Sequence, residues 1–323
     1  MNWNAKWMPL AIGGAGLAVC ALLGLALSVN TTLVMSRIVI MILFALSLNI
    51  QTGYAGLGNM GHALYFGLGS YGILVFVSKF GFNLITAVLA TIALFTFASI
   101  IIGFLTLQSD SLISFLFLSF GICLLVNTAF AKWAWIGNKS GLTYNVRPEI
   151  LNDPKMCYLL ILVVTAVCVA LMYILTKTPF IMALKGSREN ETRMIFLGVN
   201  IKNLRLVAYV ISSFFGIIAG ILYAIMNNGA YITSIDTNMA LQAMMMCLIG
   251  GGATFIGPII GAVLVTLITN YLPTVTNLDS IILGIIIILC CYFLPNGITD
   301  PNGKLVQGLK KLLKARPKEE GSR

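Results

Sequence analysis

The stretch GYAGLGNMGHALYFGLGSYG, residues 53–72, places seven glycines and the only histidine of the chain, His62, within twenty residues. It follows an apolar run, residues 34–51, that is long enough to be a membrane span. Glycine weakens a helix because it loses more backbone freedom on folding than any other residue. The stretch therefore predicts a membrane helix that is interrupted.

The whole chain has the composition of a membrane protein. Of its 323 residues, 59% are hydrophobic and only 9% are charged, whereas about 25% of the residues of a soluble domain are charged. So few charges cannot cover a water-facing surface of this size. We expect an all-α integral membrane protein whose net charge of +10 reflects membrane topology and not nucleic-acid binding.

Apolar runs of about twenty residues, which cross a hydrocarbon core of about 30 Å, recur along a predicted transmembrane domain, residues 1–303. The ten predicted spans are 9–30, 34–51, 58–78, 84–106, 111–131, 155–176, 204–227, 237–252, 257–272 and 279–295. The eighth and ninth are short, so a re-entrant pair is an alternative for them. A cleaved signal peptide is a less favoured reading of the first, which lacks a clear cleavage site.

Basic residues predict the orientation. Ten spans place both termini on one side, and 14 of the 20 lysines and arginines lie at the termini or in and beside loop 177–203. The positive-inside rule therefore predicts that both termini and this loop are cytoplasmic. Residues 304–323 form a basic tail with leucines on one helical face, which predicts an amphipathic helix on membrane lipid. A docking surface for a partner is the alternative for the tail.

A second glycine-rich interruption, IGGGATFIGPIIGA, covers residues 249–262. Gly252 and Gly257 are five residues apart, as are Gly56 and Gly61 in the first. If spans 2–5 and 7–10 are repeats, their topology is inverted, and helices interrupted at corresponding positions of such repeats point to a transporter's substrate path. Alternatively, the glycines only let helices approach closely. The residues predicted to line or hinge the path are Gly58, Asn59, Gly61, His62, Gly250, Gly251, Gly252, Gly257 and Pro258.

His62 has no carboxylate nearby in sequence that would mark it as a general base or metal ligand. Histidine titrates near neutral pH, so sensing pH is one interpretation. We favour a buried, neutral, hydrogen-bonded histidine that ties the interrupted segment to its neighbour, with Asn59 offering a donor and an acceptor one turn earlier. The seven cysteines form no metal-binding or disulfide pattern. We therefore expect no metal and no cofactor bound by this chain.

Loop 177–203 is the longest polar stretch inside the transmembrane domain. Pro179 can start a short helix and Gly198 can end one. Between them lie mixed charges and three consecutive apolar residues, 195–197. A short helix pressed against another protein would use these apolar residues, and simple packing at the membrane interface is the alternative. The residues predicted to contact the partner are Lys185, Arg188, Glu189, Glu191 and Gly198.

Three motifs resemble those of permease subunits of ABC importers for branched-chain amino acids, specifically the LivM branch. They are GLGNMGHALYFGLGSY (56–71), the loop and span that begin ALKGSRENETRMIFLGVN (183–200), and IGGGATFIGPIIGA (249–262). The resemblance implies a protein of the bacterial cytoplasmic membrane. Its partners would be a second, LivH-like permease, two cytoplasmic ATPases seated on residues 185–198, and an extracytoplasmic substrate-binding protein. ATP would be used by the ATPases, and this chain has no G-x-x-x-x-G-K-[ST] motif.

The chain departs from the family pattern in several places, among them IGNKSGL (136–142), where the family usually has Thr-Gly-Gly-x-Asp-Gly-Leu. Asn59 stands where the family usually has serine, Tyr65 where phenylalanine is usual, and Gln242 where glutamate is frequent. The resemblance adds Tyr65 and Gln242 to the predicted path. If these positions line the path, the departures widen the expected cargo beyond leucine, isoleucine and valine, because relatives carry amides, urea or aromatic acids. We therefore expect the cargo to be branched-chain or related small amino acids.

The sequence thus predicts a transport subunit and not an enzyme, because one histidine without clustered acids or cysteines offers no catalytic constellation. The alternative is a stand-alone channel or secondary transporter for a small polar solute such as urea or an amide. Proton-driven carriers usually keep ionisable residues within their spans. In this chain the acidic and basic residues of the spans lie at the span edges, which favours the permease.

Overall fold

The computed structural model describes residues 28–108, 111–144, 147–252, 254–275, 284 and 297–298. The predicted spans 9–30 and 279–295 lie almost entirely outside these residues, and the basic tail 304–323 lies wholly outside them. What the structure describes is predominantly helical, as the composition predicts.

The long helices follow one another along the chain. They are α2 (Val29–Asn49), α3 (Ala63–Ser78), α4 (Leu84–Thr106), α5 (Leu112–Lys132), α6 (Pro154–Leu175), α9 (Ile201–Asn227), α10 (Thr237–Gly250) and α11 (Ile256–Val275). The longest connections join α5 to α6 and α6 to α9. Loop 177–203 contains two short helices, α7 (Pro179–Glu189) and α8 (Glu191–Phe196). A π-helical turn, η1 (Ile50–Tyr54), follows α2 directly.

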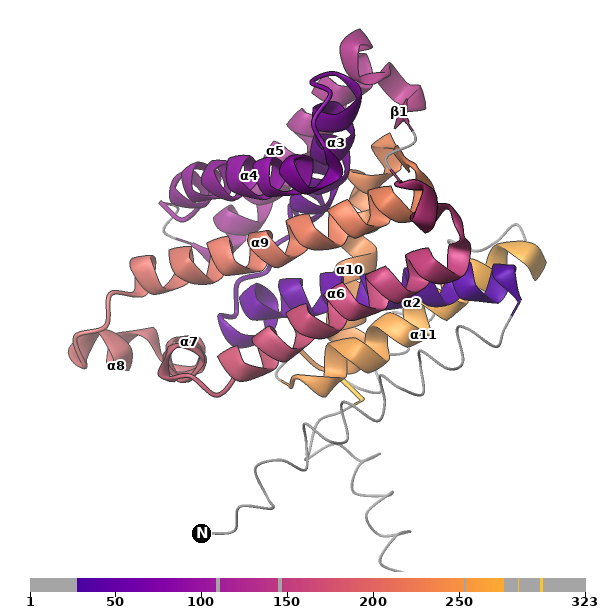
Figure 1. Cartoon of the computed structure of the whole chain (residues 1–323). Coiled ribbons are helices and arrows are strands. Elements are labelled where there is room, and N and C mark those ends of the chain that lie inside the picture. Colours follow the sequence, from indigo (N-terminus) through magenta and orange to yellow (C-terminus); the bar gives the residue numbers. More distant parts are fainter. Residues whose placement is uncertain are drawn as a thin grey trace, which may run out of the picture.

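Short elements join the helices at the end of the molecule opposite α7 and α8 (Figure 1). The 3-10 turns are η2 (Ala134–Ile136), η3 (Asn138–Ser140), η4 (Glu149–Asn152) and η5 (Ile232–Ser234). Strand β1 (Leu142–Thr143) pairs antiparallel with β2 (Gly229–Ala230), with Leu142 opposite Ala230. This pair fastens the connection between α5 and α6 to the end of α9.

Helices α2 and α9 form the centre of the described part (Figure 1). α2 packs against α6, α9, α10 and α11, while α9 also packs against α3 and α4. In the most apolar window of α2 and its π-turn, 72% of the residues are buried, compared with 17% in α4 and in α5. The peripheral α4 and α5 are apolar on their exposed faces, as helices in contact with lipid must be.

The described residues include six segments that are long and apolar enough to cross a membrane. They are Val29–Tyr54, Leu84–Thr106, Leu112–Lys132, Pro154–Leu175, Ile201–Asn227 and Ile232–Gly250. α11, with 20 residues, is about 30 Å long at 1.5 Å per residue and matches a hydrocarbon core. α10 has 14 residues and reaches about 21 Å; η5 lies before it on the chain.

Three predicted boundaries were wrong. Residues 29–33, which the sequence divides between a first span and a gap, begin α2. The predicted span 58–78 is helical only from Ala63, because residues 55–62 leave the helix after the π-turn. Loop 177–203 forms two helices instead of one, since Asn190 is extended and caps α8 with its side chain.

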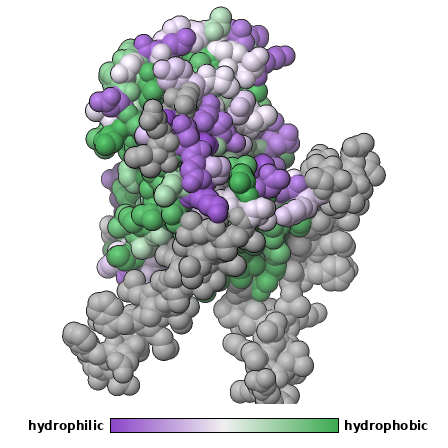
Figure 2. All heavy atoms as spheres, turned by 45° about the vertical axis from the view of Figure 1, so that its right-hand side comes forward, coloured by the Kyte–Doolittle hydropathy of each residue, from purple (hydrophilic) through white to green (hydrophobic). Residues whose placement is uncertain are grey.

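Figure 2 turns the right-hand side of Figure 1 forward, where the short connecting elements lie. Hydrophilic residues gather over the upper and middle part of this face, and hydrophobic residues flank them. This distribution suits a bundle whose ends contact water and whose sides contact lipid.

Candidate functional site

The π-turn η1 opens the first interruption, residues 55–62, which we call the first break. Its backbone makes wide turns: the Ala55 amide donates to the Ile50 carbonyl at 3.3 Å, and the Leu57 amide donates to the Gln51 carbonyl at 2.9 Å. Gly56 then adopts a left-handed φ of +70°, which disfavours side chains with a Cβ. π-turns inside helices occur frequently at functional sites, so this one marks a candidate site.

Buried side-chain amides hold the first break to the π-turn. The Asn59 amide nitrogen donates to the Gln51 side-chain oxygen at 2.6 Å, and the Asn59 oxygen accepts from the Gly61 backbone amide at 2.7 Å. Both Asn59 and Gln51 are fully buried. A buried polar side chain is costly unless it is hydrogen-bonded, so these contacts fix the path of residues 55–62.

His62 lies at the start of α3, fully buried between α2 and α9. Its Nε2 atom is 2.8 Å from the hydroxyl of Ser47 in α2, and its ring stacks on Phe44 with centroids 5.3 Å apart. A Cβ at Gly216 of α9 would lie 3.1 Å from Nε2. These contacts agree with the prediction of a buried, hydrogen-bonded histidine that ties the interrupted segment to its neighbours.

Tyr65 lies one turn further along α3 and is also fully buried. Its hydroxyl donates to the hydroxyl of Tyr209 in α9 at 2.8 Å. The tyrosine at this position therefore supplies a hydrogen bond between two helices, which a phenylalanine could not.

The second break, residues 251–255 between α10 and α11, is a place of close backbone approach. A Cβ at Gly250 would overlap the Gly257 carbonyl, and a Cβ at Gly257 would overlap the Gly251 carbonyl. Pro258 lies buried in the first turn of α11, a position where proline is tolerated. This packing is the one that the close-approach interpretation of the glycines expects.

The second break packs against the π-turn and the end of α2, about 200 residues away in sequence. A Cβ at Gly53 would overlap the carbonyl oxygen of Gly252. The Asn49 amide nitrogen donates to the Thr254 carbonyl at 3.0 Å. The π-turn is therefore joined to the first break along the chain and packs against the second break across the fold, with no space left for a Cβ at Gly53.

Helix α7 contacts the same π-turn from the other side. The guanidinium of Arg188 donates to the carbonyl of Gly53, and the Lys185 ammonium lies 4.9 Å from the ring centroid of Tyr54. A Cβ at Gly56 would lie 2.9 Å from Cγ of Arg188, so glycine leaves room for the arginine. We call this meeting of α7, the π-turn and the two breaks the junction.

The remaining predicted coupling residues lie outside the junction. Glu189 is exposed at the end of α7, and Glu191 forms an ion pair with Arg205 of α9. Gly198 has a φ of +81° just beyond α8. On α8 and beside it, Ile195, Phe196 and Leu197 are 60%, 86% and 71% exposed, so this end of the molecule presents an apolar surface flanked by charges.

The predicted path residue Gln242 lies outside the junction, about two turns before the second break on α10, and is partly buried.

Sequence reasoning missed four residues of the junction, namely Asn49, Gln51, Gly53 and Thr254. A signal for two of them existed, because polar Asn49 and Gln51 end an otherwise apolar run, and polar residues inside spans are commonly functional.

Comparison with known proteins gives one family. A family model described as "Branched-chain amino acid transport system / permease component" matches residues 30–291. The chain is similar to the high-affinity branched-chain amino acid transport system permease protein LivM of Escherichia coli (strain K12), with 24% identity over 84% of this chain and 71% of the relative. Identity with the protein of the same name from Salmonella typhimurium (strain LT2) is 23% over the same shares. No solved structure matches the chain significantly.

Proposed function

The chain belongs to the family of permease components of branched-chain amino acid transport systems, and on this premise we propose that it is a subunit of an ABC importer. The importer moves branched-chain or related small amino acids inward across the cytoplasmic membrane. Its other subunits are a second permease, two cytoplasmic ATPases that hydrolyse ATP, and an extracytoplasmic binding protein. This chain provides part of the path and no catalytic step.

The observation that carries the proposal is the contact between α7 and the π-turn. Arg188 reaches from the predicted cytoplasmic loop to the Gly53 carbonyl, and Gly53 packs on the second break. A displacement of α7 by an ATPase would therefore act on both breaks at once. Switching of this kind requires packed elements with discrete arrangements, and helices interrupted at the breaks supply ends that can rearrange.

The exposed apolar surface of residues 195–197 supports docking of a protein on α8. Large apolar side chains in the centre of a contact, surrounded by charged residues, are typical of protein interfaces. Helix α8 presents Phe196 in this way, with Glu191 and Arg193 on the same short helix.

The test is purification of the tagged chain from its native membrane in mild detergent, with identification of the proteins that remain bound. We expect a second permease and ATPases with P-loop motifs, and ATP-dependent uptake of leucine when the complex and its binding protein are reconstituted in liposomes. A chain that is stable alone and admits urea, an amide or an amino acid without ATP would be a channel or secondary carrier, and the proposal would be wrong.

A further inference from the structure

A cavity of about 550 Å³ lies beside the junction, between α8, the first turn of α9 and the facing ends of α4 and α5. Leu57 of the first break contributes to its wall. The cavity is on the α7–α8 side of the molecule, which is the predicted cytoplasmic side. Its lining residues are Leu57, Leu107, Ser111, Leu112, Phe115, Glu191, Ile195, Gly198, Val199, Asn200, Ile201, Lys202 and Arg205.

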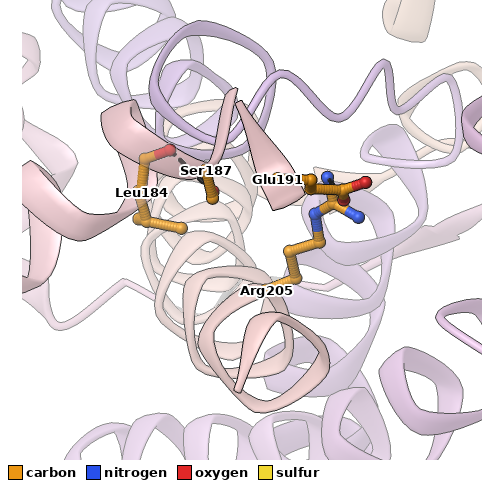
Figure 3. A network of polar contacts seen from close by, with 4 residues as sticks. All are labelled: Leu184, Ser187, Glu191 and Arg205. Carbon is orange, nitrogen blue, oxygen red and sulfur yellow. Dashed lines mark hydrogen bonds and ion pairs between the residues drawn. The ribbon is translucent and has the colours of Figure 1, made fainter. Parts of the chain in front are cut away.

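One side of the cavity is charged. Glu191 of α8 and Arg205 of α9 point toward one another and form an ion pair (Figure 3). Their side chains are 47% and 16% exposed, so water screens the pair and its net stabilisation is small. Lys202, one turn before Arg205, adds an exposed ammonium.

The start of α9 adds positive potential to the same side. α9 has 27 residues, and Asn200 caps it by accepting from the Asn203 amide at 3.1 Å. Asn200, Ile201 and Lys202 line the cavity. The first turn of a long helix favours an anionic group, because its backbone amides and the helix dipole both point there.

The opposite side is apolar. Leu112 at the start of α5, 50% exposed, supplies the accessible apolar surface of this wall, and the lining residues Leu57 and Phe115 are almost fully buried. A ligand that fits both sides carries a negative group, a positive group and an apolar part within a few ångströms. A free α-amino acid with an apolar side chain has this chemistry, and small-ligand sites commonly combine an apolar pocket with a few fixed polar groups.

We propose that this cavity binds a free α-amino acid with an apolar side chain from the cytoplasm and thereby slows its own import. The carboxylate faces Arg205, Lys202 and the first turn of α9. The ammonium faces Glu191, and the side chain lies against Leu112, which is 50% exposed. The regulatory part of this inference rests on the proposed function, since the ligand is the transported product.

The ion pair explains why occupancy would be felt elsewhere. The Glu191–Arg205 ion pair joins α8 to α9. A zwitterion that satisfies both charges replaces this contact and changes how α8 sits on α9. Because α8 carries the exposed Phe196, the docking surface for the ATPase changes with it.

The first experiment measures equilibrium binding of labelled L-leucine to the full chain purified in detergent, which needs no partner protein. Leu112→Trp fills the cavity from a half-exposed position, and Leu118→Trp is the matched control on the exposed face of the same helix. We expect saturable binding in the wild type and the control, and a loss of at least about tenfold in affinity in Leu112→Trp. 4-Methylpentanoate and 3-methylbutylamine, each lacking one charge of leucine, should compete poorly.

A second variant, Lys202→Gln, is needed because Leu112→Trp could lower binding by impairing folding. Lys202→Gln removes one exposed charge from the cavity and should weaken leucine binding several-fold, whereas Lys132→Gln at the far end of α5 should not. Absence of leucine binding to the wild type, or equal binding to wild type and Leu112→Trp, would overturn the proposal. So would reduced recovery of the ATPase with Leu112→Trp while leucine binding is unchanged, which would assign the cavity to subunit docking.

The regulatory part is tested in proteoliposomes that contain the complete complex and leucine on the ATP side. We expect uptake by the wild type and Leu118→Trp to fall several-fold, and uptake by Leu112→Trp to be insensitive. Uptake that proceeds normally in the wild type at high internal leucine would refute the feedback while leaving the importer intact. A complex without ATP-dependent uptake would refute the proposed function, whereas the binding experiment on the isolated chain would still show whether the cavity binds leucine.

Discussion

Gly53 is the residue on which the contact between the π-turn and the second break depends. Its missing side chain lets the π-turn touch the carbonyl of Gly252, and an added methyl group has no space to occupy. Overpacking of a close contact usually costs about 1–3 kcal/mol, and here the strain falls on the segment that we propose to switch.

We therefore expect Gly53→Ala to lower the thermal stability of the detergent-purified chain and to reduce leucine uptake strongly. Gly121→Ala is the matched control, because a Cβ at Gly121 of α5 meets no atom within 4 Å. Both melting temperature and uptake should be nearly unchanged in the control. Equal stability and uptake in the two variants would show that the breaks do not need this contact.

Arg188 differs from the acidic residues of its loop because its side chain, although exposed, reaches the backbone of the π-turn. Its hydrogen bond to the Gly53 carbonyl predicts a role in transmitting movement and not in holding the partner. Arg188→Gln should leave recovery of the ATPase in a pull-down unchanged while lowering uptake per ATP hydrolysed by about fivefold or more, the range of a typical coupling energy. Arg193→Gln, which changes an exposed arginine of α8, should retain uptake. Loss of the ATPase with Arg188→Gln would place the arginine in the docking surface instead.

At the scale of elements, α8 is too short to be stable alone and its apolar residues are exposed. A helix of six residues is below the length at which isolated helices form in water, so it depends on its cap at Asn190, its ion pair with α9 and any partner. Phe196 is the most exposed of its apolar side chains.

Phe196→Asp should therefore weaken binding of the ATPase by about 30-fold, since a central aromatic residue commonly contributes about 2 kcal/mol or more. Phe196→Leu keeps an apolar side chain and should bind with a much smaller loss. The measurement is the amount of ATPase that stays bound to the tagged chain as the purified complex is diluted stepwise in detergent buffer. Full recovery with Phe196→Asp would move the docking surface away from α8.

The acidic residues of the loop give a separate test of the docking surface. Glu189→Lys combined with Glu191→Lys should abolish association with the ATPase while the protein still inserts in the membrane. Glu191 is 47% exposed but Arg205 only 16%, so reversing the charge at Glu191 costs some stability, and the level of inserted protein is measured together with association. Normal complex formation and uptake would show that these charges are not part of the contact.

At the scale of the whole molecule, the distribution of basic residues predicts which end faces the cytoplasm. A cysteine placed at Phe196 should react with a membrane-impermeant maleimide only after the cells are opened. A cysteine placed at exposed Asn138, at the opposite end of the molecule, should react in intact cells. Of the seven native cysteines, the four at positions 123, 157, 168 and 247 are buried and should react slowly, and the other three are replaced by serine before the experiment. The reverse pattern would invert the topology and remove α7 and α8 from the side where ATP is hydrolysed.

The sequence by itself determined the class of fold, because composition and run length are properties of the chain alone. Apolar runs such as 84–106 and 204–227 agree with α4 and α9 to within a few residues, since a helix that crosses lipid must satisfy its backbone internally. The three motifs likewise sufficed for the family. The start of α3 was placed five residues early, because glycines in an apolar run look the same in sequence whether they sit inside a helix or before it.

Only the tertiary structure decided which of these residues meet. Nothing in residue spacing shows that Gly53 touches Gly252 or that Arg188 reaches the Gly53 carbonyl, because contacts across more than a hundred residues depend on how α2, α7 and α10 pack. The same holds for Glu191, whose pairing with Arg205 requires the turn between α8 and α9. The chain thus encodes its helices locally, and the junction arises only when their interrupted ends are brought together.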